Sequence, residues 1–387
     1  MMIKLRFLLI LFIFTLSCSD KNGEQLGYTL INVHNLKDDG NKLIEMVSEY
    51  ELIPLQYAGA ESLVSMIIKT EITSQNIYLL CSRSNGSKYL LIFDIEGDFR
   101  RKIEEISSDE LISSKVKYFA LDNDGQLIIL DDKNNLLFLD ENYDYHMHTS
   151  LPFKFDTFYK NGEHFLSYAN LHAFDLQPDS LFFNLMVVNE HFELENKYMP
   201  FEINVGETRY HNRIHGNIQP NLNGFLFTEF LNDTIYEVDE QSMMPKYVYN
   251  FGKDRVDKEG FENVHISPFS PILVEKFKWG LNSPIETEKY LFAHYWDKKT
   301  PKGILYNKTN NTTAVHNPMN LLEDQDIIPW PKIHRDGYFY GYFTEGDFGG
   351  MDIDRIINYP KTSSVKQIYE HIQANANPVF VKYKINN

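Results

Sequence analysis

Short runs of apolar residues alternate with polar turns along most of the chain, and Val116–Thr149 is the clearest example. Four runs rich in β-forming residues are separated there by turns of Asp, Asn and Gly: Val116–Leu121, Gln126–Leu130, Leu136–Leu139 and Tyr143–Thr149. Such turns between β-rich runs are the strongest short-range signal for hairpins. The stretch therefore predicts a four-stranded antiparallel meander, which is the size of one propeller blade.

Looser versions of this pattern begin near residues 65, 116, 155, 213, 271 and 330. Their spacing of roughly 40–60 residues is in the range of propeller repeats, and the absence of βαβ alternation excludes a parallel-sheet fold. Ile272–Trp279 and Trp330–His334 are predicted as strands of the last two repeats. We predict an all-β fold, a six-bladed β-propeller of four-stranded antiparallel blades. Seven blades remain an alternative if the N-terminal strands form a blade of their own.

One short helix is predicted near the C-terminus. Hydroxyl side chains at 362–364 can cap it, apolar residues recur at helical spacing from 365 to 372, and Pro378 cannot continue it. Val379–Ile385 then forms a final strand. Because an open ring of blades would leave two sheet edges, we expect this strand to close the ring by pairing with Tyr50–Leu55 near the N-terminus.

The first residues are typical of a leader. A basic start precedes the apolar run Phe7–Leu16, which is too short to span a bilayer, and a small residue then precedes Cys18. We predict a lipoprotein signal peptide at 1–17, a lipidated Cys18 with a polar tether over 18–40, and a single propeller domain over 41–387. A secretory peptide that is cut elsewhere is the alternative.

Composition limits the classes of molecule that this protein is expected to bind. The formal net charge of −17 argues against nucleic acid and anionic lipid surfaces, since both are polyanions. Phe and Tyr are numerous, at 28 and 24 residues, and provide for a large core. Cys81 lies in the apolar run IYLLC, which favours a buried structural thiol, and a lipidated Cys18 would leave it without a disulfide partner.

Several segments together carry a family resemblance. The leader, the strand YELIPL, the hairpins LLIFDIEGDFRRKI and LIILDDKNNLLFLDEN, the segment LNDTIYEVDEQSMMPKYVYNFG and the closing NPVFVKYKI resemble the six-bladed, TolB-like β-propeller lipoproteins of Bacteroidetes. The resemblance runs from about residue 40 to the end of the chain. It implies a propeller fold and an outer-membrane lipoprotein that faces the periplasm or the cell surface. It implies no catalytic residues.

Connections between blades open onto one face of a propeller, where ligands usually bind. The longest predicted connections are Met199–Gly216, Gly252–Ser270 and Asn317–Pro329. In the first, His211, Arg213 and His215 share one face if the segment is extended, and could hold an anion or, with a carboxylate, a metal ion. The alternative is a solvated loop.

Aromatic residues late in the chain are a second candidate binding set. Trp279, Trp296 and Trp330 could stack on sugar rings, and Lys332 and His334 share the parity of Trp330, so one face of that segment could line the channel. A core role is the alternative for each tryptophan.

Two function classes follow. The first is a non-catalytic binding or scaffold propeller for a glycan or an envelope protein, monomeric, held at the membrane by a lipid anchor only. The alternative is a hydrolase or lyase with its site at the channel mouth, with His211 or His215 as base and with or without a divalent cation in the channel. No other cofactor and no dedicated metal ligands are predicted, and the sequence contains no GxSxG, HExxH or nucleotide-binding motif.

Overall fold

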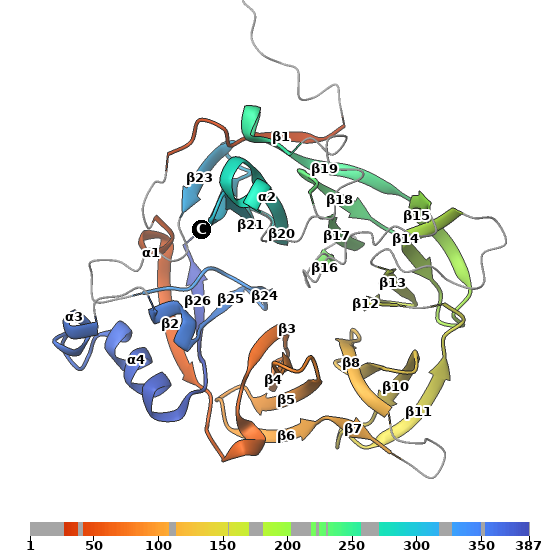
Figure 1. Cartoon of the computed structure of the whole chain (residues 1–387), viewed down its shortest axis with the longest axis horizontal. Coiled ribbons are helices and arrows are strands. Elements are labelled where there is room, and N and C mark those ends of the chain that lie inside the picture. Colours follow the sequence, from red (N-terminus) through yellow and green to blue (C-terminus); the bar gives the residue numbers. More distant parts are fainter. Residues whose placement is uncertain are drawn as a thin grey trace, which may run out of the picture.

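Six antiparallel sheets form a closed ring around a central axis (Figure 1). The computed structural model describes residues 27–37, 42–107, 114–153, 155–169, 181–202, 218–221, 224–229, 231–256, 271–316, 327–349 and 353–386. Each sheet has its first strand at the axis and its fourth strand at the rim. The predicted six-bladed propeller is therefore confirmed, and the N-terminal strands form no seventh blade.

The first three blades each take their four strands from one continuous stretch of chain. Blade 1 contains β3 (Met66–Ile72), β4 (Asn76–Ser82), β5 (Lys88–Asp94) and β6 (Phe99–Ile103). Blade 2 contains β8 (Ser114–Leu121), β9 (Leu127–Asp131), β10 (Asn135–Leu139) and β11 (Tyr145–Ser150), with the short β7 (Glu105–Ile106) beside β8. Blade 3 contains β12 (Thr157–Asn161), β13 (His164–Tyr168), β14 (Leu181–Val188) and β15 (Leu194–Glu202).

Blades 4 and 5 follow the same plan, and blade 6 combines both ends of the chain. Blade 4 contains β16 (Ile218–Asn221), β17 (Gly224–Thr228), β18 (Thr234–Val238) and β19 (Met243–Asn250). Blade 5 contains β20 (Lys278–Glu286), β21 (Tyr290–Asp297), β22 (Thr300–Asn307) and β23 (Thr312–His316). Blade 6 contains β24 (Ile333–Arg335), β25 (Tyr338–Phe343), β26 (Val379–Ile385) and, outermost, β2 (Val47–Pro54).

The ring closes through the pairing of β2 with β26, as the sequence predicted. The two strands are antiparallel, and their register places Leu52 opposite Val381 and Pro54 opposite Val379. Strands from both ends of the chain thus lie side by side in blade 6, which closes the ring. The closing strand also pairs with β25, so β26 is hydrogen-bonded on both sides.

A strand before the closing pair joins a different blade. β1 (Thr29–Asn32) lies parallel to β19 on the rim of blade 4, with Ile31 opposite Tyr249 (Figure 1). Ile31 is 1% exposed and packs in the core between blades 4 and 5. Part of the segment predicted as a polar tether is thus built into the propeller.

Aspartate-led turns explain why the sequence pattern of blade 2 is so regular. The Asp122 carboxylate accepts hydrogen bonds from the backbone N–H of Asp124 and Gln126, and Gly125 takes a positive φ of 84°. The buried Asp131 does the same for the next turn, where it accepts from the backbone of Asn135 at 2.6 Å. These side chains replace the backbone partners that a tight turn leaves free.

Apolar side chains fill the spaces between neighbouring blades rather than one central core. The largest cluster joins blades 1 to 3 and includes the fully buried Phe119 and Phe158. Cys81 is a buried free thiol in β4, and burial raises its pKa to about 12, in agreement with the structural role that the sequence predicts.

Helices lie outside or between the blades. They are α1 (Lys42–Met46), α2 (Pro271–Lys276), α3 (Ile353–Ile357) and α4 (Ser364–Asn375), with 3₁₀ turns η1 (Ala60–Ser62), η2 (Gly252–Asp254) and η4 (Glu345–Phe348). α4 is the predicted C-terminal helix: Ser363 caps it, and Ile368 and Ile372 are buried. Within the described ranges, no helix is long and apolar enough to cross a membrane.

The strand predicted over Ile272–Trp279 is wrong except for its last two residues, which lie in β20. Residues 271–276 form α2, and the innermost strand of blade 5 is β20, which starts at Lys278. Pro271 fits the first turn of a helix, where a missing N–H costs nothing, and Leu273 is fully buried beneath it.

Candidate functional site

Four residues singled out in the sequence fall outside the described part of the chain: Cys18, His211, Arg213 and His215. Their roles as lipidation site and as candidate anion, metal or catalytic groups therefore stay predictions.

Trp279 and Trp296 face each other across β20 and β21 at one end of blade 5. Their rings stack, with centroids 5.6 Å apart and planes 11° apart. Trp279 is 2% exposed, its indole N–H donates to the Lys298 carbonyl at 3.3 Å, and Leu273 of α2 packs against the pair. Trp279 therefore takes the core role, while Trp296 keeps part of its surface accessible.

Trp330 does not lie in an inner strand, because β24 begins only at Ile333. Pro329 and Pro331 flank it, and neither can donate to a strand ladder. The Trp330 side chain is 5% exposed and occupies the space between blades 5 and 6, where its ring centroid lies 5.6 Å from that of Phe292. The predicted strand over Trp330–His334 is thus wrong in its first half.

Two glycines make room for this connection. A Cβ at Gly303 of blade 5 would come within 2.7 Å of three atoms of the Trp330 indole. A Cβ at Gly341 of blade 6 would meet the Trp330 carbonyl oxygen at 2.7 Å and the Pro329 ring at 2.8 Å. The connection that carries Trp330 therefore fits between blades 5 and 6 only because Gly303 and Gly341 have no Cβ.

Lys332 and His334 lie at the start of the innermost strand of blade 6, which lines the central channel. Protein surrounds Lys332, and burial lowers the pKa of its ammonium, which Asp347 partly opposes. Its side chain nevertheless keeps part of its surface accessible, as expected in the wall of a narrow channel. His334 is exposed, its ring lies 4.7 Å from that of Phe339, and burial lowers its pKa as well.

Two histidines that were not predicted lie beside Trp330. The register across blade 5 aligns His294 with Gly303 and Gly303 with His316, so that both imidazoles flank the glycine under the indole. Each imidazole centroid lies 5.6 Å from that of Trp330. Burial and the nearby charge of Lys332 hold the pKa of His294 well below its usual value. Both histidines lie in predicted strands, but their alignment depends on a register that the sequence does not give.

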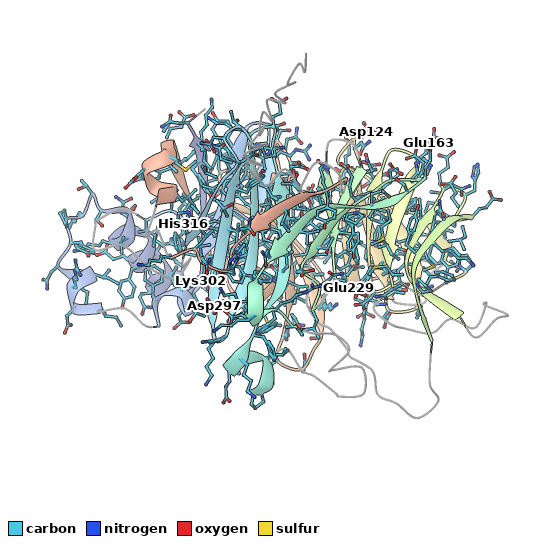
Figure 2. All side chains as sticks on the ribbon, turned by 90° about the horizontal axis from the view of Figure 1, so that it is seen from above. Asp124, Glu163, Glu229, Asp297, Lys302 and His316 are labelled. Atoms are coloured by element: carbon cyan, nitrogen blue, oxygen red, sulfur yellow. The ribbon has the colours of Figure 1, made fainter. Side chains whose placement is uncertain are left out.

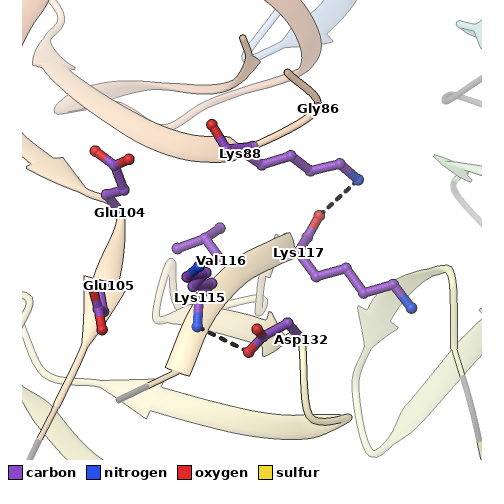
Figure 3. A pocket seen from close by; sticks show the side chains of 9 residues that line it. Gly86, Lys88, Glu104, Glu105, Lys115, Val116, Lys117 and Asp132 are labelled. Carbon is purple, nitrogen blue, oxygen red and sulfur yellow. Dashed lines mark hydrogen bonds between the residues drawn. The ribbon is translucent and has the colours of Figure 1, made fainter. Parts of the chain in front are cut away.

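A groove with a volume of about 320 Å³ lies between blades 1 and 2 (Figure 3). Its lining consists of Gly86, Ser87, Lys88, Glu104, Glu105, Lys115, Val116, Lys117 and Asp132. The Lys88 ammonium donates to the Lys117 carbonyl at 3.0 Å across the blade boundary, and the Lys115 N–H donates to Asp132 at 3.0 Å. The first bond joins the two walls of the groove, and the second lies within the wall that blade 2 provides. Glu105 and Lys115 are exposed and lie opposite each other in the pairing of β7 with β8.

One wall of the groove contains a cluster of ion pairs around the Glu104 carboxylate. Arg83 makes a two-pronged ion pair with Glu104, and Lys102 lies 3.3 Å from the same carboxylate. These bonds, with that from Arg83 the largest cause, lower the pKa of Glu104 to about 2. Glu104 is therefore ionised at neutral pH, and the groove combines charges of both signs.

In blades 1 to 4, the described turns differ in charge between the two faces of the propeller. We call the face that carries the connections between blades and the turns between second and third strands the loop face. It includes the groove, Arg83, Lys133 and Lys299, and Figure 2 shows Glu229 and Asp297 on this side and Asp124 and Glu163 on the other. On the opposite face, the described turns of blades 1 to 4 carry carboxylates and neither lysine nor arginine, as at Glu96, Asp122, Asp124, Asp140, Asp144, Glu163, Glu193 and Asp239.

Metal-ligating residues do not gather in the described ranges: no three His, Cys, Asp or Glu side chains there are placed to hold one ion. The divalent cation considered for the channel remains untested.

The architecture defines the class: a six-bladed β-propeller whose loop face carries a polar groove. The chain belongs to the family described as domain of unknown function DUF4934, whose model matches residues 29–384. No curated protein matches the sequence.

A solved Bacteroides structure agrees on the fold. A putative exported protein of Bacteroides fragilis superposes with a TM-score of 0.68 at 17% identity, over 93% of this chain and 100% of that one. The extracellular domain of a putative hybrid two-component system of B. thetaiotaomicron gives a TM-score of 0.37 at 12% identity, over 70% of this chain and 33% of that one. BamB of Moraxella catarrhalis gives 0.35 at 10% identity, over 67% of each chain.

Proposed function

We propose that this protein is a cell-envelope lipoprotein of the TolB-like type, anchored through Cys18, whose propeller binds a glycan or a partner protein on its loop face without catalysing a reaction. The groove between blades 1 and 2 carries the proposal. It is a preformed concave site whose walls are joined by a hydrogen bond between blades, as expected of a binding site on a rigid scaffold.

The distribution of charged side chains supports the loop face as the binding face. The carboxylate-rich opposite face repels anionic glycans and other polyanions, whereas the groove offers Lys115 and Glu105 side by side. Groups of both signs in one groove suit a polar ligand with donors and acceptors along its length, such as a glycan or a peptide segment. Aliphatic stems of the lysines and Val116 add apolar contact.

Export and anchoring rest on the leader-like sequence and on the likeness to an exported protein of Bacteroides fragilis. The outer membrane is the proposed location, with the loop face presented to the periplasm or to the surroundings of the cell. Replacement Cys18→Ala tests this directly: the protein should move from the membrane fraction to the soluble fraction, and unchanged fractionation would refute the anchor.

Binding is tested with the chain lacking its leader on glycan arrays and in pull-downs from envelope extracts. Glu105→Lys places two lysines opposite each other in the groove and should weaken binding at least about tenfold, since like charges juxtaposed in a site cost several kcal/mol. Glu163→Lys is the matched control, an exposed glutamate on the opposite face. Equal binding by both variants, or loss of binding in both, would refute the assignment of the groove as the binding site.

A further inference from the structure

The junction of blades 5 and 6 holds a second candidate site. We propose that Lys332, together with His294 and Trp330, binds a small oxyanion there, a carboxylate, sulfate or phosphate group of a ligand that reaches the channel wall. The site is separate from the groove between blades 1 and 2. It deepens the proposed function, on which it rests, by naming a chemical group that the ligand carries.

Lys332 is a cation without a counter-ion. Its ammonium makes neither an ion pair nor a hydrogen bond with the described residues, although protein surrounds it closely enough to lower its pKa. Asp347 is the carboxylate whose charge opposes that shift, but its Oδ2 is occupied by the backbone N–H and the hydroxyl of Thr344, at 2.7 and 2.8 Å. Desolvating a charge without pairing it is costly, so such a group points to a missing anion.

Two neutral groups beside this ammonium also lack partners. The Nε1 atom of Trp330 and the Nε2 atom of His294 are buried and have no hydrogen-bond partner. Their rings are 5.6 Å apart, and Pro331, which separates Trp330 from Lys332, accepts a hydrogen bond from His294 through its carbonyl. Buried polar atoms without a partner are rare in native proteins and indicate a group not present in the protein itself.

A water molecule is the simplest alternative occupant. It could bridge the indole N–H and the lone pair of a neutral imidazole. It would leave the Lys332 charge uncompensated, however, whereas an oxyanion satisfies the ammonium and the indole N–H at once. The two donors, the Lys332 ammonium and the indole N–H, favour the anion, and its negative charge would oppose the shift that keeps His294 neutral.

The site is both accessible and rigid. Lys332 and His294 keep part of their surface accessible, whereas Nε2 of His294 and Nε1 of Trp330 are buried, so a small group reaches the Lys332 side chain first. The connection that carries Trp330 and Lys332 is pinned on both sides of the indole: the Tyr383 hydroxyl donates to the Pro329 carbonyl at 3.0 Å, and the Lys332 N–H donates to the Tyr340 carbonyl at 2.7 Å. Donors held in this way lose little freedom when they bind.

The test is thermal unfolding of the full-length chain with increasing acetate, sulfate, phosphate or galacturonate, against sodium chloride at equal ionic strength, with galactose as a neutral control. We expect at least one oxyanion to raise the melting temperature in proportion to the logarithm of its concentration above Kd, by about 2–4 °C at a hundredfold excess over its Kd. Galactose should have no effect. The series also separates a free inorganic anion from the carboxylate of an acidic sugar.

Variants assign the effect to the site. Lys332→Met should weaken the anion response at least about tenfold and raise the melting temperature without anion, because it removes an unpaired charge. Lys332→Gln serves the same purpose if the methionine variant does not fold. Trp330→Phe keeps an aromatic ring at this position but removes the indole N–H, and it should weaken the anion response about fivefold. Lys299→Met, an exposed lysine of the loop face, is the matched control and should respond like the unchanged protein.

Two results would overturn the oxyanion site: no response of the unchanged protein to any oxyanion, which leaves a water as the occupant, or an undiminished response of Lys332→Met. Glu105→Lys is measured in the same series. Loss of glycan or partner binding in Glu105→Lys with an intact anion response supports both sites. Loss of both the anion response and groove binding in Lys332→Met would refute the separation of the oxyanion site from the groove.

Discussion

The indole of Trp330 lies directly on Gly303 of the neighbouring blade, so close that a Cβ there would come within 2.7 Å of three ring atoms. Gly303 has ordinary strand geometry, with no positive φ. The requirement for glycine is therefore steric and belongs to the contact between blades 5 and 6.

Substituting this glycine tests the contact. Gly303→Ala should lower the free energy of unfolding by about 1–3 kcal/mol, because the buried indole has no free space to move into. Gly346→Ala, where the nearest atom lies 3.7 Å from the added Cβ, is the control and should change stability by less than about 0.5 kcal/mol. Urea unfolding measures both. Combining Gly303→Ala with Trp330→Leu should recover part of the loss, and strict additivity would contradict the contact.

Glu286 joins blades 4 and 5 through a buried network. Its carboxylate accepts hydrogen bonds from Lys246 at 2.8 Å, the Tyr247 hydroxyl at 2.6 Å and Lys308 at 3.1 Å. We expect Glu286→Gln to cost about 2–3 kcal/mol at pH 7, since hydrogen bonds to a charged group are lost and two lysines keep fewer partners. Chemical denaturation checks this, with the exposed Glu163→Gln as control.

The lowered pKa of Glu286 predicts that the stability of the protein depends on pH. Burial opposes its ionisation, but the bonds from Lys246 and Tyr247 outweigh this and lower the pKa of Glu286 below its ordinary value of 4.5. The unfolded chain then binds the proton more readily, so the stabilisation is complete above pH 4.5 and is lost as pH falls through the folded pKa. The unchanged protein should lose more stability than Glu286→Gln below pH 4.5. Parallel curves would contradict the shift.

Lys69 predicts a second dependence of stability on pH, in the alkaline range. It is 6% exposed, lies over the Tyr159 ring at 3.6 Å and donates to the Phe119 carbonyl at 2.9 Å. Burial lowers its pKa from 10.5 to about 8, partly opposed by Glu71. Between these values the unfolded chain holds a proton that the folded protein has released, so stability should rise with pH, by about 3 kcal/mol at most.

Lys69→Met removes this titration. The difference in free energy of unfolding between the unchanged protein and the variant should therefore move in favour of the unchanged protein from pH 8 to 10.5, in urea titrations at several pH values. The exposed Lys115→Met is the control, and its difference should stay constant over the same range.

Ring closure can be tested by shortening the chain. Removing residues 379–387 deletes β26, which pairs with both β2 and β25 and buries Val381 and Tyr383 completely. We expect the shortened chain to lose its cooperative unfolding transition and to aggregate, because it exposes two strand edges. Removing residues 386 and 387 alone should leave the melting temperature within about 2 °C. A folded, monomeric chain without β26 would show that closure is dispensable.

Local chemistry explains how much of this fold was predictable. An antiparallel blade is made from strands that are neighbours in the sequence, so turns such as those led by Asp122 and Asp131 reveal it without any knowledge of distant contacts. The closing strand Val379–Ile385 was predictable for another reason, because an unpaired sheet edge is unfavourable wherever it occurs. The sequence by itself thus determined the blades and the way the ring closes, with six blades favoured over seven.

Contacts between blades were decided by the tertiary structure alone. The parallel pairing of β1 with β19 joins residues more than two hundred positions apart, and nothing local marks it. Residues 271–276 became a helix because a buried place for Leu273 outweighed the strand-like sequence. The row His294, Gly303 and His316 beneath Trp330 exists only through strand register and the packing of one blade on the next. Side chains of the candidate oxyanion site come together by these long-range contacts, for which a linear pattern has no signal.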